Sequence, residues 1–203
     1  MVRRTKEEAL ATRDSILDAA EQLFVRQGVS HTTLQHIATE AGVTRGAIYW
    51  HFEDKAAVFN ALMQRARMPL ESAMQVLDQL ESEDPLGDLR DYSLAVFRMT
   101  VENPRARTVF EIATLKMEYV DELSAVRARR KQTMQEWATR AERRVALAVK
   151  QGQIRAGVDA QAVALGLWSL TEGLIRNWLM TPSFDLLAIG TQAVDTHLGG
   201  LRA

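Results

Sequence analysis

The sequence contains no cysteine, which excludes disulfide bonds, thiolate catalysis and zinc sites built on cysteine ligands. A chain without cysteine suits a reducing compartment. No apolar run approaches the ~20 residues that a membrane-spanning helix needs, and the first residues are charged rather than typical of a signal peptide. We therefore expect a cytoplasmic protein that makes no membrane contact.

Motifs for cofactors and catalysis are missing as well. The sequence shows no HExxH motif, no nucleophile paired with a base and no phosphate-binding glycine loop. His36 and Glu40 are spaced to share a metal ion on one helix face, although two solvated polar side chains are the commoner arrangement. An enzyme is the weakest interpretation, and we expect no metal and no cofactor.

The chain also lacks the basic excess that is usual in proteins that bind nucleic acid, because its formal net charge is -1. Its hydrophobic content of 47% and charged content of 25% are ordinary for a globular protein, and 203 residues are enough for a small domain and a larger one. Basic residues nevertheless gather in the first third of the sequence, at Arg3, Arg4, Lys6, Arg13, Arg45 and Lys55.

The most informative segment is Thr32 to Phe52, which reads TTLQHIATEAGVTRGAIYWHF. Thr33 is placed to cap a short helix through its hydroxyl, and Gly42 is placed to end it, because glycine accepts the left-handed conformation without steric cost. Thr44 then caps a second helix that begins at Arg45. Two short helices joined by a tight turn are typical of a helix-turn-helix DNA-binding motif.

The side chains of this segment separate into a buried face and an outward face. Apolar residues recur at helical spacing in the first helix, at Leu34, Ile37, Ala38 and Ala41. Ile48 and Phe52 are four residues apart and are expected to pack on the first helix. The outward face of the second helix then carries Arg45, Gly46, Tyr49 and Trp50. Arginine is the usual reader of guanine, and a glycine beside it lets the backbone approach DNA closely.

The sequence around the motif resembles the DNA-binding domain of the TetR family of bacterial transcriptional regulators. The resemblance covers residues 1 to about 60 and rests on TRDSILDAAEQLFVRQG (12–28), on the motif itself and on DKAAVFNAL (54–62). The opening MVRRTKEEALATR and the core GVTRGAIYWHF are most similar to the AcrR- and TtgR-like branch, whose members repress multidrug efflux pumps.

By position, the resemblance implies which residues contact DNA. The residues that match phosphate contacts are Thr33, Thr44, Tyr49, Trp50, His51 and Lys55. Arg45 and Gly46 match the base-reading pair. For Trp50 and His51 the alternative is a helix end that packs on the first helix of the domain.

The rest of the chain predicts an all-α protein, since helical periodicity continues with few breaks and no alternating strand segment appears. We expect one long helix from about residue 55 to 80, a turn at 82–88, and a break at Asn103–Pro104, because a residue before proline resists the helical conformation. Gly152 and Gly157 are expected to bracket a loop.

Residues 105–155 hold twice as many basic as acidic residues, and AVRARRK (125–131) is the densest part. A second nucleic-acid site is conceivable on charge alone. We favour a solvated helix face, because no aromatic residues are interleaved with the charges.

The segment 162–180 is apolar around most of its circumference, as expected of a helix buried from more than one side. Gly166 and Gly173 are seven residues apart and share a face, which allows another helix to approach closely. With a final helix at about 184–201, this segment is expected to form a homodimer interface, as the resemblance also implies. A two-fold dimer reads two half-sites spaced ~34–36 Å apart.

Glu172 is the anomaly in this apolar segment, because a buried carboxylate needs a partner. One alternative is an ordinary pair with Arg176 at i+4, and the other is a polar anchor in an apolar ligand cavity. The resemblance implies such a cavity for a hydrophobic or aromatic effector, although a plain core would use many of the same residues. By helix position its candidate lining residues are Arg67, Tyr92, Ser93, Val96, Phe110, Thr114, Trp137, Ala141, Trp168 and Glu172.

Together these features predict a three-helix helix-turn-helix DNA-binding domain at residues 1–54 and a larger helical domain for ligand binding and dimerisation at 55–203. The predicted function is that of a ligand-responsive repressor of multidrug efflux genes, which hydrophobic effectors release from a palindromic double-stranded operator. The alternative is a DNA-binding regulator without a ligand, whose large domain serves only dimerisation.

Overall fold

The computed structural model describes residues 6–117 and 123–202, and the expected basic pair Arg3 and Arg4 lies outside them. The described residues confirm the all-α prediction, with a single isolated antiparallel bridge between Ile154 and Arg202 as their only β pairing. None of the described helices is long and apolar enough to cross a membrane. The chain forms two compact units, the first from residues 1–66 and 108–129 and the second from 67–107 and 130–203.

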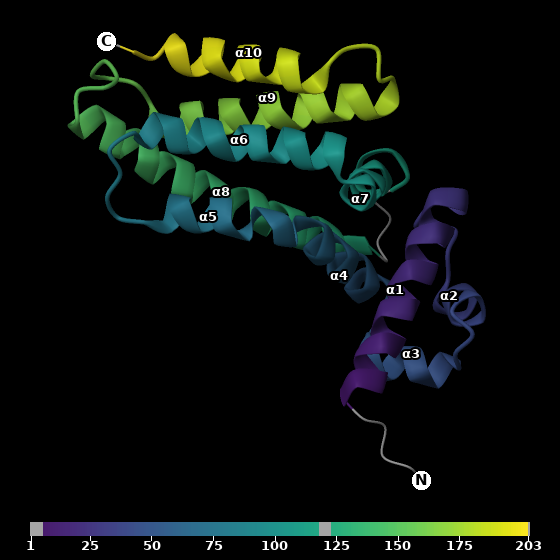
Figure 1. The fold of residues 1–203 in the computed structure, drawn as a ribbon. Coiled ribbons are helices and arrows are strands. Elements are labelled where there is room, and N and C mark those ends of the chain that lie inside the picture. Colours follow the sequence, from purple (N-terminus) through teal and green to yellow (C-terminus); the bar gives the residue numbers. More distant parts are fainter. Residues whose placement is uncertain (1–5, 118–122, 203) are drawn as a thin grey trace. The chain divides into compact units, whose positions relative to one another are not determined.

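The first unit contains the predicted helix-turn-helix and the helices around it (Figure 1). Its helices are α1 (Lys6–Gln27), α2 (Leu34–Glu40), α3 (Arg45–His51), α4 (Lys55–Arg67, except for its last residue) and most of α7 (Pro104–Leu115). Aromatic packing joins α1 to α4, because the rings of Phe24 and Phe59 lie 6.4 Å apart. Val58, Leu62 and Ala66 are buried on α4.

An ion-pair cluster reinforces the contact between α1 and α4. Arg65, whose side chain is only 17% exposed, donates to Asp18 at 2.8 Å and to Glu21 at 3.3 Å. Asp14 lies slightly farther, at 3.8 Å. One guanidinium thus faces three carboxylates that helical spacing places on the same side of α1.

The predicted long helix at 55–80 is wrong, because the chain breaks it into three pieces (Figure 1). α4 ends at Arg67, a 3-10 turn η1 covers Met68–Leu70, and α5 runs over Glu71–Asp78. The break follows from Pro69, which has no backbone N–H to donate and whose ring obstructs the preceding turn of an α-helix. The boundary between the two compact units falls between residues 66 and 67, directly before this turn.

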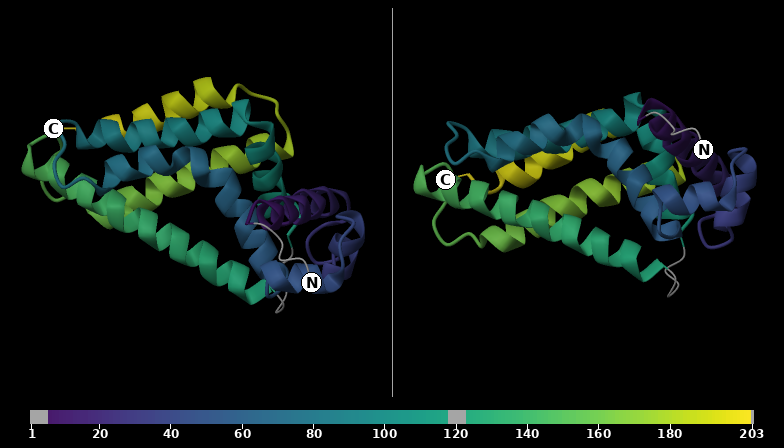
Figure 2. Two further views of the ribbon diagram at one scale, coloured as in Figure 1. Left: turned by 60° about the horizontal axis from the view of Figure 1, so that its bottom comes forward. Right: turned by 90° about the horizontal axis from the view of Figure 1, so that it is seen from below.

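The second unit is a helical bundle in which α6, α9 and α10 lie side by side (Figures 1 and 2). Its main helices are α5, α6 (Pro85–Glu102), the greater part of α8 (Ser124–Lys150), α9 (Ala160–Met180) and α10 (Leu186–Gly199). α6 ends where Asn103–Pro104 predicted. Gly152 and Gly157 adopt φ values of 71° and 83° in the loop before α9, which confirms that break also.

α10 packs against α6 through a glycine. A Cβ added at Gly190 would lie 2.6 Å from the ring of Phe97, which is fully buried. Non-bonded carbon atoms do not approach this closely, so the close approach of the two helices depends on the absence of a side chain at Gly190.

The basic residues of α8 are not the uniformly solvated face that we expected. Arg140 and Arg143 bind Asp78 at the end of α5, at 2.8 and 3.2 Å. Arg144 is buried, donates to the carbonyl of Val76 and lies 3.4 Å from a carboxylate oxygen of Asp88 on α6. These three arginines therefore link α8 to α5 and α6 in the second unit. Arg127 and Arg129 are exposed, as predicted.

Candidate functional site

The local structure of the helix-turn-helix agrees with the prediction from its sequence. The hydroxyl of Thr33 accepts from the backbone N–H of His36 at the start of α2. Gly42 takes the left-handed conformation, with φ 65°. Thr44 caps α3, since its hydroxyl accepts from the N–H of Ala47 at 3.1 Å.

The outward face of α3 is polar and aromatic. Ile48 is fully buried on the inner face, whereas Arg45, Gly46 and Tyr49 are exposed. Arg45 donates to the hydroxyl of Tyr49 at 2.9 Å and lies over its ring. Because that ring is on the outside of the unit, the guanidinium is held at the exposed surface of α3 and not folded against the core.

Trp50 does not pack on the first helix, because 72% of its surface is exposed. The ring centroids of Trp50 and His51 lie 4.5 Å apart, with the two rings nearly perpendicular. His51 itself is half-buried beside Phe52. Large exposed aromatic side chains are uncommon on a surface that meets only water. This arrangement favours the interpretation of Trp50 as a contact residue over the alternative of a packed helix end.

Lys55 differs from the other candidates of the motif. Its side chain is 4% exposed, and Nζ donates to the carbonyl of Ser30 at 3.2 Å. The ammonium therefore joins the start of α4 to the segment before α2. Its assignment as a phosphate contact stays a prediction that requires the side chain to turn outward.

An aromatic cluster in the second unit unites several of the predicted ligand-contacting residues. The ring of Trp137 on α8 lies 6.1 Å from Tyr92 on α6 and 5.4 Å from Trp168 on α9. Trp137 is 2% exposed, and its Nε1 has no hydrogen-bond partner among the described residues. Burial raises the pKa of the Tyr92 phenol, and the charges of Arg67 and Arg140 oppose that shift.

The sequence interpretation of Glu172 was wrong in two respects. Its side chain is 42% exposed instead of buried, and it pairs with Arg130 on α8 instead of with Arg176. Its second oxygen accepts from Nε1 of Trp168 at 3.1 Å. The carboxylate thus ends a chain of contacts that begins in the aromatic cluster.

The remaining pocket candidates fall into two groups. Arg67 donates to Thr133 at 3.4 Å, and Ser93 and Ala141 are buried beside the aromatic cluster, with Val96 half-buried. Phe110 and Thr114 lie on α7 in the first unit. Arg130 and Thr133 were missed by the sequence interpretation, because residues that meet across two helices far apart in the chain leave no local pattern.

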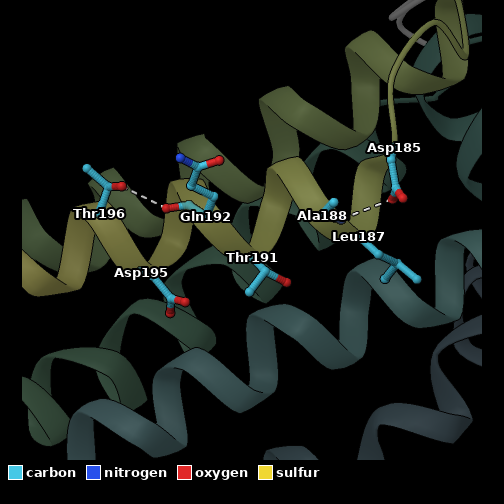
Figure 3. A pocket seen from close by; sticks show the side chains of 7 residues that line it. All are labelled: Asp185, Leu187, Ala188, Thr191, Gln192, Asp195 and Thr196. Atoms are coloured by element: carbon cyan, nitrogen blue, oxygen red, sulfur yellow. Dashed lines mark hydrogen bonds between the residues drawn. The ribbon is translucent and has the colours of Figure 1, made fainter.

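The outer face of α10 carries a shallow open depression (Figure 3). Figure 3 shows small and polar side chains along it, and the residues that line it are Asp185, Leu187, Ala188, Thr191, Gln192, Asp195 and Thr196. Arg90 of α6 holds Asp195 through two hydrogen bonds, of 2.5 and 3.1 Å. The opposite face of α10 carries Gly190 and is buried.

Two protein families match parts of this sequence. Residues 16–62 match the family described as bacterial regulatory proteins, tetR family, and residues 84–202 match the C-terminal region of MAATS-type transcriptional repressors. The chain belongs to the TetR family. The second match covers more than half of the sequence, so both the DNA-binding and the C-terminal parts of this TetR family regulator are identified.

Its relatives include repressors of multidrug efflux pumps. The chain is 40% identical to the HTH-type transcriptional regulator TtgR of Pseudomonas putida over all of its 203 residues and 97% of that protein. The structure of NalD, the secondary repressor of the MexAB-OprM multidrug efflux pump of Pseudomonas aeruginosa, superposes with a TM-score of 0.88 at 34% identity, covering 97% of this chain and 98% of that one. A complex of SmeT with triclosan superposes with a TM-score of 0.83 at 31% identity, covering 95% and 92%.

Proposed function

We propose that this TetR family regulator represses multidrug efflux genes and leaves its operator when a hydrophobic or aromatic effector binds the second unit. The whole-length likeness to TtgR carries this proposal, because one relative matches both the DNA-binding helices and the effector domain. Such a protein binds and releases DNA in the cytoplasm and catalyses no reaction.

The DNA contacts that we propose are those of the outward face of α3 and the ends beside it. Arg45 would read a base in the major groove, with Gly46 allowing the helix to approach. The residues proposed to contact the phosphates are Thr33, Thr44, Tyr49, Trp50, His51 and Lys55. Thr33 and Thr44 are the N-caps of α2 and α3, which supports their roles, since backbone N–H groups at helix starts favour anions.

The effector site that we propose centres on the aromatic cluster of the second unit. Trp137 Nε1 is a buried donor that has no acceptor in the part of the chain that the structure describes, a state that buried polar groups rarely keep. A ligand acceptor beside it would satisfy that donor, and Glu172 with Arg130 would supply a polar end to an otherwise apolar site.

We further propose a homodimer formed through α9 and α10, which gives two reading heads for a palindromic operator. Large apolar side chains remain exposed on these two helices, at Leu165, Met180 and Ile189. On the open face of α10 in Figure 3, the small side chains of Ala188 and Thr191 would let a second copy pack closely.

The test is operator binding at fixed salt, using DNA from upstream of the gene, with and without triclosan and a panel of hydrophobic antibiotics and plant phenolics. We expect specific binding that one or more compounds weaken. Glu172→Gln should keep DNA binding and lose release, whereas Trp178→Phe, a conservative change on the same helix beneath Arg107, should keep both. Specific binding that no compound changes would instead favour a regulator without a ligand.

A further inference from the structure

The start of α2 is held by a histidine where a carboxylate or amide is usual. His36 is the third residue of the helix, and its Nδ1 accepts from the backbone N–H of Thr33 at 3.4 Å, while the Thr33 hydroxyl accepts from the N–H of His36 at 3.1 Å. This reciprocal pair is a capping box, in which the third position is ordinarily Glu or Gln.

A side chain from α1 joins the same nitrogen. Gln27 places Nε2 3.3 Å from Nδ1 of His36, 3.2 Å from the hydroxyl of Thr32 and 3.1 Å from the carbonyl of His31. Thr32 is fully buried and donates to the carbonyl of Gly28. The ring of His36 therefore connects the capping box of α2 to the end of α1.

This network requires the neutral imidazole. Nδ1 has one lone pair, which accepts only while the ring proton is on Nε2. Protonation of Nδ1 would place an N–H against the N–H of Thr33. A turned Gln27 amide would accept the new proton, but its nitrogen would then leave Thr32 and His31. In both arrangements the backbone N–H of Thr33 loses its acceptor, at an end where the N–H groups of the helix need one.

The charges around His36 do not replace this contact. Glu40 lies one turn farther along α2 and is paired with Arg26 of α1 at 2.9 Å. From α1 the ring meets the neutral Gln27, and from the preceding segment it meets Thr33, with the exposed His31 nearby in sequence. None of these groups offers the N–H of Thr33 another acceptor.

We propose that His36 is a positioning residue for DNA recognition, whose neutral ring fixes the start of α2 and the orientation of Thr33, so that acidification weakens operator binding. Histidine is the side chain that changes charge near neutral pH. The inference rests on the proposed function in requiring that α2 and α3 bind DNA. It adds a residue that does not contact DNA but sets the position of one that does.

The test compares the full-length wild type with His36→Gln and His36→Ala on one duplex, selected by the wild type from a random-sequence pool at pH 8. Glutamine keeps the capping box and does not titrate, whereas alanine removes it. Affinities are measured from pH 8 to 5.5 at constant salt. The ratio of wild type to His36→Gln at each pH cancels the pH dependence that the two proteins share.

We expect the wild type to lose about fivefold in affinity relative to His36→Gln on acidification, which corresponds to about 1 kcal/mol and to the loss of one cap. His36→Ala should be weaker than both at pH 8 by a similar factor and show no further relative loss. In NMR spectra of the free protein, the Thr33 amide resonance should move on acidification of the wild type and stay in place in His36→Gln.

A constant ratio of wild type to His36→Gln across the pH range, or a His36→Ala protein that binds as the wild type does at pH 8, would overturn the inference. Selection of no duplex at all at pH 8 would overturn the proposed function, and this inference with it. A pH-dependent ratio on a tightly bound duplex would support both.

Discussion

Trp50 in the first unit and Trp137 in the second present the same side chain in opposite settings. Trp50 is 72% exposed at the end of α3, and Trp137 is 2% exposed among the rings of the second unit. The exposed indole leaves an apolar surface without cover, and the N–H of the buried indole has no acceptor among the residues 6–117 and 123–202. The two indoles thus differ in what each lacks in the free protein, in agreement with the two partners proposed above, DNA for the first unit and a small-molecule effector for the second.

The largest effect should come from deleting the buried ring. Trp137→Ala is expected to lower the free energy of unfolding by about 3–5 kcal/mol, because it leaves a large cavity in the core of the second unit. Urea unfolding followed by circular dichroism measures this loss. Trp50→Ala should leave the unfolding midpoint within error of the wild type and weaken DNA binding. Equal destabilisation by the two variants would contradict the contrast.

A smaller loss is expected from adding a single methyl group at the contact of α6 and α10. Gly190→Ala should cost up to about 3 kcal/mol, since its Cβ would overlap the ring of Phe97. Phe97→Leu in the same chain should recover part of the loss by giving way to the methyl group. Additive effects of the two substitutions in a thermodynamic cycle would show that the ring and the glycine do not meet.

In the first unit, Arg45→Ala should act on DNA binding and not on stability. We expect operator affinity to fall roughly 30-fold, or about 2 kcal/mol, with discrimination lost at one base pair. Fluorescence anisotropy on a set of single-base operator variants measures both quantities. Arg98→Ala, an exposed arginine of α6, is the matched control and should bind as the wild type does.

The smallest effect concerns the ion pairs that fasten α5 to α8. Hydrogen bonding from Arg140, together with the charges of Arg140 and Arg143, holds the pKa of Asp78 below its ordinary value of 3.8, against a smaller opposing effect of burial. The folded state thus gains stability from the ionised carboxylate above pH 3.8 and loses it as the pH falls through the lower folded value.

Asp78→Asn should therefore cost less than about 1 kcal/mol at pH 7, because the pair is substantially exposed. The difference from the wild type in urea unfolding should shrink as the pH is lowered below 3.8. A difference that grows on acidification would reverse the assigned sign.

The features that were predicted correctly from the sequence are those that depend on short segments of the chain. The caps at Thr33 and Thr44, the turn at Gly42 and the break at Asn103–Pro104 each depend on a residue and its immediate neighbours. Local chemistry decides such features before any tertiary contact forms.

The features that it did not predict depend on contacts between distant segments. The partner of Glu172 lies 42 residues away on α8, and the position of Gln27 beside His36 depends on how α1 meets α2. The prediction of an unbroken helix at 55–80 failed for a different reason. Apolar periodicity continues through this segment, but Pro69 has no backbone N–H to donate inside an α-helix.

The packing of Gly190 on Phe97 has a consequence for selection in bacterial populations. Every missense change at a glycine codon adds a side chain, and at this position no side chain fits. Where exposure to drugs favours cells that have lost an efflux repressor, any amino-acid replacement at this codon weakens the fold of the second unit. Resistant lineages carrying an otherwise intact gene should be enriched for changes there, far in sequence from the helices that read DNA.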